Sequence, residues 1–290
     1  MQGRGQFQAV IRLEWDAVSR LLPVTNYRVW DEIKNGKARE IQQPIGQLAA
    51  VHKRIADLLA RVELPDFLYS RKGRSYIDNA LQHRGSLPLI KTDIHKFYPS
   101  TTWQMVYDFF IFDCECASDV AHQLSDLCCY QQKHVPTGSP LSGYLAYFAA
   151  RHMFDEVAAL AQQRGCVMTA YVDDITVSGQ GATKELLGEI RLIISRHGLK
   201  TRQKKSVTYA ATAPKAVTGV VIANAEIRLP NTRHEKISDA RKALVSAASN
   251  SKAKALQSLN GRLREAAQVL GKNASLSADT FASRRHPSVD

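Results

Sequence analysis

Apolar residues return at helical spacing in several stretches of the chain. From Leu48 to Leu59, leucine, valine and isoleucine recur every three or four positions, with lysine, arginine and aspartate between them. The same spacing runs through residues 141–164 and 186–194, and a glycine follows each stretch. These patterns predict amphipathic helices with one face in the core. Beyond residue 230, alanine, serine, lysine and arginine at helical spacing predict a small helical unit from about Asn231.

Runs of β-branched and apolar residues between these helices predict strands. Residues 87–93 form a short run that ends on an aspartate, and residues 217–227 form another. Between residues 167 and 178, two β-branched runs meet at Asp173 and Asp174. This pattern predicts a β-hairpin that carries the acidic pair at its tip.

Composition narrows the class of protein. The chain has 290 residues, 44% of them hydrophobic, which is enough for one large domain or two modest ones. It has no run of about 20 apolar residues, and no signal-peptide core follows the N-terminus, so we expect a cytoplasmic protein without a membrane partner. Five cysteines without a CxxC pair predict buried or inert thiols rather than disulfides or a zinc site.

The charge of the chain suggests a polyanionic partner. Lysine and arginine number 39 against 27 aspartates and glutamates, a formal excess of +12. Basic residues gather around residues 71–74, 200–205 and 233–264, and three separated clusters suit a long groove for nucleic acid. Charge alone is a weak signal, because a basic surface without any partner gives the same composition.

Three aspartates lie where predicted strands end. Asp93 closes one strand, and Asp173 and Asp174 join the two strands of the hairpin. Carboxylates at strand ends suit hard cations such as Mg²⁺, which keep positions open for phosphate and water. Two such ions about 3.5–4 Å apart support nucleotidyl transfer or the corresponding hydrolysis. The structural alternative is a polar turn at the acidic pair, with Asp93 capping the next helix.

These aspartates lie in segments that resemble reverse transcriptases. Tyr171-Val172-Asp173-Asp174 matches the YxDD motif of that family, and residues 91–100 (KTDIHKFYPS) resemble its first catalytic motif. The resemblance covers roughly residues 39–270. It implies an RNA-directed DNA polymerase with an α+β, right-hand polymerase fold of fingers, palm and thumb, in which the palm is an antiparallel sheet packed on helices. The implied boundaries are 1–86 for N-terminal helices and fingers, 87–228 for the palm with part of the fingers inserted around 101–135, and 229–290 for the helical thumb and tail.

The resemblance also implies roles for single residues. Asp93 and Asp173 would hold two Mg²⁺ ions, Asp174 would assist, and the backbone carbonyl of Ile94 would complete the coordination. Tyr98 would block the sugar 2′-OH and so select deoxynucleoside triphosphates, although ordinary core packing is the alternative. The other residues implied to bind the nucleotide are Arg71, Lys72, Arg74, Gly138, Ser139 and Lys205. For the basic residues among them, a solvated surface is the competing interpretation.

A proline-rich segment resembles the motif that lines the nucleotide and template site. It runs over residues 136–142 (PTGSPLS), where Gly138 would let the backbone approach a base pair closely. Many family members have glutamine where Thr137 stands, so the hydrogen bonds at this position are open. The alternative is a helix start marked by prolines.

Two short signatures point to the bacterial retron branch of the family. Residues 79–83 (NALQH) fit its NAxxH signature, and residues 217–219 fit its VTG signature. The resemblance implies a structured noncoding RNA partner, priming from a guanosine 2′-OH, and a branched RNA–DNA hybrid (msDNA) that stays bound within an anti-phage defence system with a separate effector protein. The residues implied to bind RNA are Asn79, His83, Val217, Thr218, Gly219, Arg233, Arg262 and Arg264. The structural alternatives are a helix-end histidine and a strand that runs into a turn.

Other functions remain open from the sequence. A different class of bacterial reverse transcriptase, of the abortive-infection or diversity-generating type, would share the aspartates and differ in RNA partner and priming. A catalytically vestigial RNA-binding subunit is a second alternative, although all three carboxylates are present. A magnesium-dependent nuclease is a third, but it leaves Tyr98, the segment 136–142 and Lys205 unexplained as a set.

Overall fold

The computed structural model describes residues 1–34, 36–223 and 226–282. It combines helices with antiparallel strands, so the expected α+β class is confirmed. The chain forms two compact units that alternate along the sequence. The first unit holds residues 1–66, 92–160 and 188–206, and the second holds residues 67–91, 161–187 and those from 207 onwards. The fingers, palm and thumb boundaries stay a prediction.

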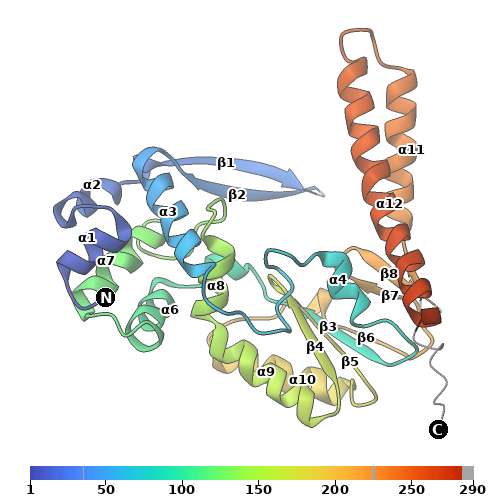
Figure 1. Cartoon of the computed structure of the whole chain (residues 1–290), viewed down its shortest axis with the longest axis horizontal. Helices are drawn as coiled ribbons and strands as arrows, with labels where there is room; N and C mark the ends of the chain where they lie inside the picture. Colours follow the sequence, from blue (N-terminus) through green and yellow to red (C-terminus); the bar gives the residue numbers. More distant parts are fainter. Residues whose placement is uncertain (35, 224–225, 283–290) are drawn as a thin grey trace. The chain divides into compact units, whose positions relative to one another are not determined.

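The first unit is mainly helical and carries one two-stranded antiparallel ribbon (Figure 1). Its helix α3 (Gly46–Leu59) confirms the predicted amphipathic helix and packs against α7 (Ser118–Cys128) and α8 (Ser142–Ala149), with Leu48 and Val51 in the core. The ribbon, which sequence periodicity did not predict, consists of β1 (Tyr27–Lys34) and β2 (Lys37–Pro44). The remaining elements are α1 (Arg4–Ile11), α2 (Val18–Leu21), α5 (Phe97–Ser100), α6 (Trp103–Asp108), a π-helical turn at Phe109–Asp113, and 3-10 turns at Trp15–Ala17, Val24–Asn26 and Gln203–Lys205.

The single helix predicted over residues 141–164 is wrong. The structure has two helices there, α8 and α9 (Arg151–Gln163), and Ala150 separates them with φ −110° and ψ 11°. That conformation lies outside the α-helical region. The break has neither glycine nor proline to mark it, so tertiary packing overrides the local pattern. The predicted helix over residues 186–194 is confirmed as α10 (Lys184–Arg196).

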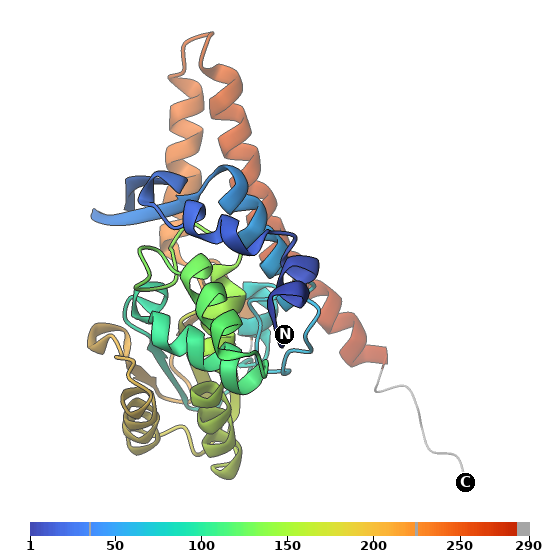
Figure 2. The same cartoon turned by 90° about the vertical axis from the view of Figure 1, so that its left-hand side faces the viewer.

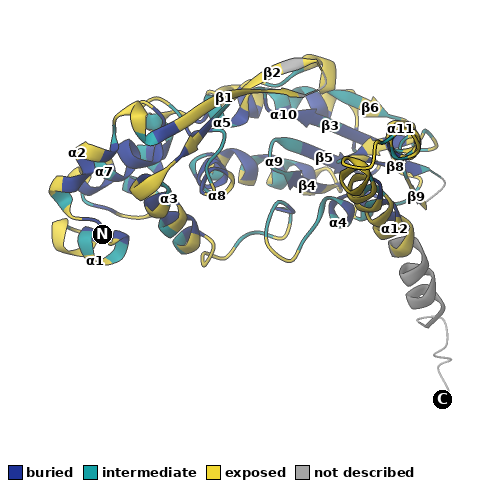
Figure 3. Ribbon diagram, turned by 90° about the horizontal axis from the view of Figure 1, so that it is seen from above, coloured by how far each residue is buried: buried dark blue, intermediate teal, exposed yellow. Residues whose placement is uncertain are grey.

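The second unit contains a four-stranded sheet in the order β4-β5-β3-β6. The predicted hairpin is confirmed as β4 (Val167–Tyr171) and β5 (Asp174–Ser178), and the predicted strand near residue 90 is β3 (Leu89–Asp93). β6 (Val207–Tyr209) pairs with the other edge of β3, whose last two residues belong to the first unit. Figure 3 shows that β3 and β5 are largely buried, whereas the β1–β2 ribbon is largely exposed.

A second sheet and two helices complete this unit. The stretch 217–227, predicted as strand, is divided by a turn at residues 218–219 and contributes to three short antiparallel strands, β7 (Lys215–Val217), β8 (Val220–Ala223) and β9 (Glu226–Arg228), while residues 224 and 225 lie outside the described residues. Helix α4 (Tyr76–Leu81) packs on them, and the shared core includes Ile77, Ala80, Leu89, Val217, Val220, Ile222, Ile227 and Val269. The helical unit begins at the predicted residue, with α11 (Asn231–Val245) and α12 (Lys252–Ala282) side by side (Figures 1 and 2).

All five cysteines are free and four of them are buried, as expected for structural thiols. In the part of the chain that the structure describes, no helix combines the length and apolarity that a membrane span requires.

Candidate active site

The acidic hairpin has a tight two-residue turn. Tyr171 pairs with Asp174 in the β4–β5 register, so Val172 and Asp173 form the loop and Asp174 is the first residue of β5. Val172 adopts φ 58°, a left-handed conformation that costs energy for a β-branched residue and persists only where its surroundings enforce it. Met168, Ala170, Ile175 and Val177 anchor the two strands in the core. The hairpin therefore presents its half-buried carboxylates on a rigid support.

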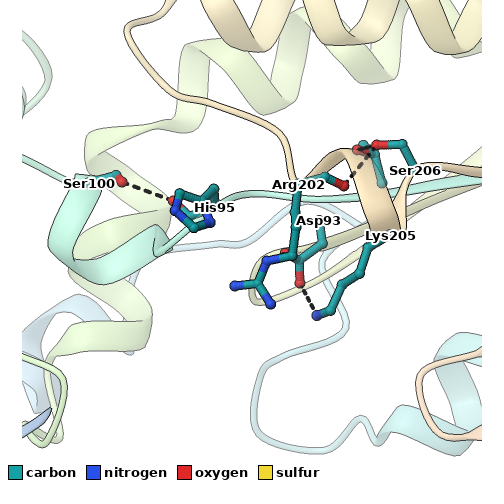
Figure 4. Close-up of polar contacts among 7 residues, drawn as sticks. Asp93, His95, Ser100, Arg202, Lys205 and Ser206 are labelled. Atoms are coloured by element: carbon teal, nitrogen blue, oxygen red, sulfur yellow. Dashed lines mark hydrogen bonds and ion pairs between the residues drawn. The ribbon is translucent and has the colours of Figure 1, made fainter. Parts of the chain in front are cut away.

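Asp93 ends β3 in the first unit and is fully buried between two cations (Figure 4). Lys205 Nζ donates to its Oδ2, and Arg202 Nε lies 3.4 Å from its Oδ1. The backbone N–H of Arg202 also donates to the Asp93 carbonyl over 2.8 Å. Because an unpaired buried carboxylate is costly, these two cations offset the cost of burying Asp93.

The donor chemistry of Asp93 fits a magnesium ligand. Its Oδ1 is buried and accepts no hydrogen bond from any residue that the structure describes. Within the same described residues, no three His, Cys, Asp or Glu side chains gather into a ready-made metal cluster. Asp93 belongs to the first unit, whereas Asp173 and Asp174 belong to the second.

The carbonyl of Ile94 is oriented by the strand segment after Asp93. Ile94 forms an isolated antiparallel bridge with Thr201. The hydrogen bonds of this bridge are made by neighbours, from Arg202 N to the Asp93 carbonyl and from His95 N to the Lys200 carbonyl. In such a non-hydrogen-bonded pair, the carbonyl of Ile94 points away from Thr201. The Ile94 carbonyl oxygen is therefore not used in pairing with Thr201, as a metal ligand requires.

Tyr98 lies on the short helix α5 of the first unit. Its ring stacks on the buried Phe97 with ring centroids 5.9 Å apart, and it is itself only partly buried. A Cβ built on Gly143, in the first turn of α8, would lie 3.9 Å from the Tyr98 hydroxyl. Tyr98 is thus packed at its base with its hydroxyl beside α8, which is compatible with a gate and not with a fully buried core tyrosine.

The segment 136–142 is fixed to strand β2. A Cβ on Gly138 would lie 2.8 Å from Ile41 Cγ2 and 3.0 Å from the Gln42 carbonyl, so only glycine fits without displacement. Thr137 Oγ1 donates to the Glu40 carbonyl over 2.7 Å and accepts from Gln42 N over 3.2 Å. Thr137, which stands where many family members have glutamine, therefore joins this loop to β2.

His52, which the sequence did not single out, supports the predicted site residue Ser139. It is fully buried in α3, its Nε2 lies 2.7 Å from the Leu127 carbonyl, and its Nδ1 lies 2.7 Å from Ser139 Oγ. A carbonyl can only accept, so Nε2 carries the proton and Nδ1 accepts from Ser139. Burial lowers the pKa of His52 to about 4, so the ring is neutral near pH 7. A histidine on the apolar face of the predicted helix was the available signal.

The NAxxH residues are internal. His83 is 3% exposed and lies 2.8 Å from Ser178 Oγ and 2.7 Å from Thr169 Oγ1, one contact to each strand of the acidic hairpin. Burial lowers the pKa of His83 to about 3. Asn79 is fully buried, and its Nδ2 lies 3.4 Å from Thr218 Oγ1. This burial argues against direct contact of either side chain with RNA.

The VTG residues form the β7–β8 turn. Val217 is fully buried, whereas Thr218 is half-buried and Gly219 is exposed. Thr218 and Gly219 have φ 41° and φ 90°, as in a two-residue turn with positive φ at both positions. The Thr218 hydroxyl donates to the Tyr76 carbonyl over 2.8 Å. The two retron-like signatures are joined by the hydrogen bond that Asn79 Nδ2 donates to this same hydroxyl.

The remaining basic candidates lie in the second unit. Arg74 stacks over the Tyr69 ring at 4.7 Å, beside the exposed Lys72 and the half-buried Arg71. Arg233 is paired with Glu265, so its charge is already offset within the helical unit. Arg264 is exposed, and Arg262 is half-buried with an Nε that has no hydrogen-bond partner among the described residues.

Comparisons with known proteins agree on one family. The sequence pattern of the family described as "Reverse transcriptase (RNA-dependent DNA polymerase)" matches residues 31–237. The chain is 28% identical over 220 residues to the Retron Ec86 reverse transcriptase of Escherichia coli, a match that covers 73% of this chain and 68% of the relative. It is 27% identical over 205 residues to the Retron Se72 reverse transcriptase of Salmonella heidelberg (strain 579083-10), covering 69% of this chain and 53% of the relative. The match therefore spans about half to two thirds of these relatives.

A solved structure supports the fold. The apo telomerase from Candida tropicalis truncated from its C-terminal domain superposes with a TM-score of 0.53 at 12% identity, covering 71% of this chain and 55% of that chain. At this identity the likeness concerns the fold alone.

Proposed function

The chain belongs to the reverse transcriptase family of RNA-directed DNA polymerases, and from that premise we propose that it is the polymerase of a bacterial retron, acting in the cytoplasm. It copies a structured noncoding RNA, starts from a guanosine 2′-OH in that RNA, and leaves the DNA product joined to its template and bound to the protein. The similarity to retron reverse transcriptases and the presence of both signatures support this proposal.

The buried Asp93 beside Lys205 and Arg202 is the observation that carries the polymerase chemistry. Lys205 and Arg202 keep side-chain exposures of 45% and 38%, so a triphosphate can reach the cations that Asp93 holds in place. In the proposed reaction Asp93, Asp173 and Asp174, with the carbonyl of Ile94, would hold two Mg²⁺ ions. Bound there, such ions would supply charge that lowers the pKa of the attacking hydroxyl and offsets charge on the leaving pyrophosphate. A cation held by Asp93 would take the place of its pairing with Lys205, whose ammonium group would then be available to the triphosphate.

The other nucleotide contacts follow from the same proposal. Tyr98 excludes the ribose 2′-OH and so selects deoxynucleoside triphosphates. Gly138 and Ser139, held by β2 and His52, line the site of the nascent base pair. The loop with Arg71, Lys72 and Arg74 adds positive charge for the triphosphate. Two exposed or half-exposed arginines of α12, Arg262 and Arg264, grip the RNA backbone.

In this proposal the RNA–DNA hybrid and the polymerase act in anti-phage defence with a separate effector protein. The support is the similarity to retron reverse transcriptases, because no described residue marks an effector surface. Co-purification of other proteins with this polymerase is the experiment that tests for the effector.

The decisive experiment isolates the nucleic acid bound to the protein. The gene is expressed with its flanking DNA, and the purified complex is treated with RNase, DNase or debranching enzyme, beside an Asp173→Asn control. We expect a short DNA joined to RNA through a 2′ linkage in the wild type, and RNA alone in the control. RNA alone in both, with activity on an added primed template, would keep the polymerase and refute the retron assignment.

A second experiment tests the shared metal site without relying on activity. Fe²⁺ replaces Mg²⁺, and ascorbate with peroxide then generates radicals that cut the backbone next to the bound iron. We expect cuts beside both Asp93 and Asp173, suppressed by excess Mg²⁺ and by Asp93→Asn. Cuts at one position only would refute a site formed by both carboxylates.

A further inference from the structure

The two retron-like signatures meet inside one unit, and we propose that they form an internal bracket that positions the catalytic hairpin. The bracket consists of Tyr76, Asn79, His83, Thr169, Ser178 and Thr218. His83 holds the β4–β5 hairpin at one end, and Asn79 holds the VTG turn at the other. The proposal rests on the polymerase activity of the family and not on the identity of the RNA.

At the hairpin end of the bracket, His83 bonds to the face of the β4–β5 hairpin that carries Asp174. Side chains alternate between the two faces of a strand, and Tyr171 pairs with Asp174 while Thr169 pairs with Thr176. Thr169 and Ser178 therefore lie on the same face as Asp174. By bonding to one hydroxyl on each strand, His83 fixes their register, and a one-residue slip would turn Asp174 to the other face.

His83 suits this role because it is neutral. A neutral imidazole has one N–H donor and one acceptor nitrogen. It can therefore donate to one of the two hydroxyls and accept from the other. With 3% exposure, the ring is shielded from solvent that could compete for those bonds. Each strand is thus tied to the same rigid ring.

The turn end of the bracket stabilises a strained residue. Thr218 is β-branched and adopts φ 41°, a conformation that needs support from its surroundings. Its hydroxyl donates to the Tyr76 carbonyl over 2.8 Å and accepts from Asn79 Nδ2 at 3.4 Å. Both partners belong to α4, so this helix determines the conformation of the VTG turn.

Helix α4, which connects the two ends of the bracket, is held rigidly. Ser75 and Asp78 form a capping box at the start of α4, with reciprocal hydrogen bonds of 2.9 Å and 3.2 Å. Ile77 and Ala80 are buried in the core shared with β7–β9 and α12. At the helical unit, Tyr76 donates to Glu265 over 3.0 Å, and Glu265 also pairs with Arg233. A displacement of the VTG turn or of α12 is therefore transmitted to α4 and to the hairpin.

Hydrogen exchange with Thr218→Val tests the bracket. Valine keeps the β-branched shape and removes the hydroxyl, while Thr218→Ser keeps the hydroxyl, and the exposed Thr212→Val is the matched control. We expect amides of residues 167–178 to exchange about five- to thirtyfold faster in Thr218→Val, the range for losing one or two net hydrogen bonds. Thr218→Ser and Thr212→Val stay close to the wild type. Faster exchange confined to residues 215–221 would overturn the proposal.

A kinetic measurement separates positioning from RNA contact. On a generic primed template, Thr218→Val should lower kcat for nucleotide addition by a similar factor while leaving the affinity for that template unchanged. His83→Gln keeps one donor and one acceptor and should retain most of the activity that His83→Leu loses. Weaker template binding at unchanged kcat, or equal losses in the two His83 variants, would overturn the bracket. None of these outcomes depends on whether the bound product is a branched hybrid.

Discussion

Acid should destabilise this protein through two buried histidines. The pKa of His52 falls to about 4 and that of His83 to about 3, both mainly through burial, from an unfolded value near 6.5. Below about pH 6.5 the unfolded chain therefore binds protons on these histidines that the folded chain does not bind. The free energy of unfolding falls as the pH decreases from about 6.5 towards the folded-state pKa values. Between pH 7.5 and pH 5 the loss is about 2 kcal/mol for each histidine. Together they remove about 4 kcal/mol from a typical total of 5–15 kcal/mol.

Glutamine substitution isolates this effect from the carboxylates that also titrate. We would measure urea unfolding of the wild type, His52→Gln, His83→Gln and the exposed His234→Gln at pH 7.5 and pH 5. Each buried-site variant should be less stable at pH 7.5 yet lose about 2 kcal/mol less on acidification, because glutamine does not titrate. His234→Gln should follow the wild type. An unchanged pH dependence in either buried-site variant would refute neutral burial as the cause.

Three further substitutions test the site. Tyr98→Ala should relax discrimination against ribonucleoside triphosphates, measured as the ratio of kcat/KM for the two sugars, and an unchanged ratio would remove Tyr98 from the gate. Gly138→Ala puts a methyl 2.8 Å from the nearest side-chain atom of β2 and should cost about 1–3 kcal/mol in unfolding, whereas Gly188→Ala, which meets nothing within 4 Å, should not destabilise. Lys205→Ala leaves Asp93 short of a cation, so Mg²⁺ should raise Tm more in this variant than in the wild type, and equal gains would contradict the pairing.

Local patterns in the sequence determined most of the elements near the site. The helix at residues 46–59, the hairpin at residues 167–178 and the helix start at Asn231 follow from spacing and residue type alone. Such signals succeed because amphipathic periodicity and β-branched runs act over a few neighbouring residues. The YxDD motif and the first catalytic motif indicated the family through their resemblance to known motifs, each of which is also a short local stretch of sequence.

Tertiary structure decided how those elements are used. The helix break at Ala150 has no local signal, because neither glycine nor proline marks it and tertiary packing sets it. The β1–β2 ribbon does have a local signal, the Asn35-Gly36 pair typical of a two-residue hairpin loop, which apolar periodicity does not detect. The burial of Asn79 and His83 changes their expected role from RNA contact to internal support. The sequence showed polar residues at helical spacing, which is equally compatible with a surface and with a satisfied core.

The contacts that define the site join residues far apart in the chain. His52 and Ser139 are 87 residues apart, Asp93 and Lys205 are 112 apart, and Asn79 and Thr218 are 139 apart. The sequence by itself determined which residue types were present and which elements carried them. Only the fold determined the partners, because a buried polar group must satisfy its hydrogen bonds and charge with whatever groups packing places beside it.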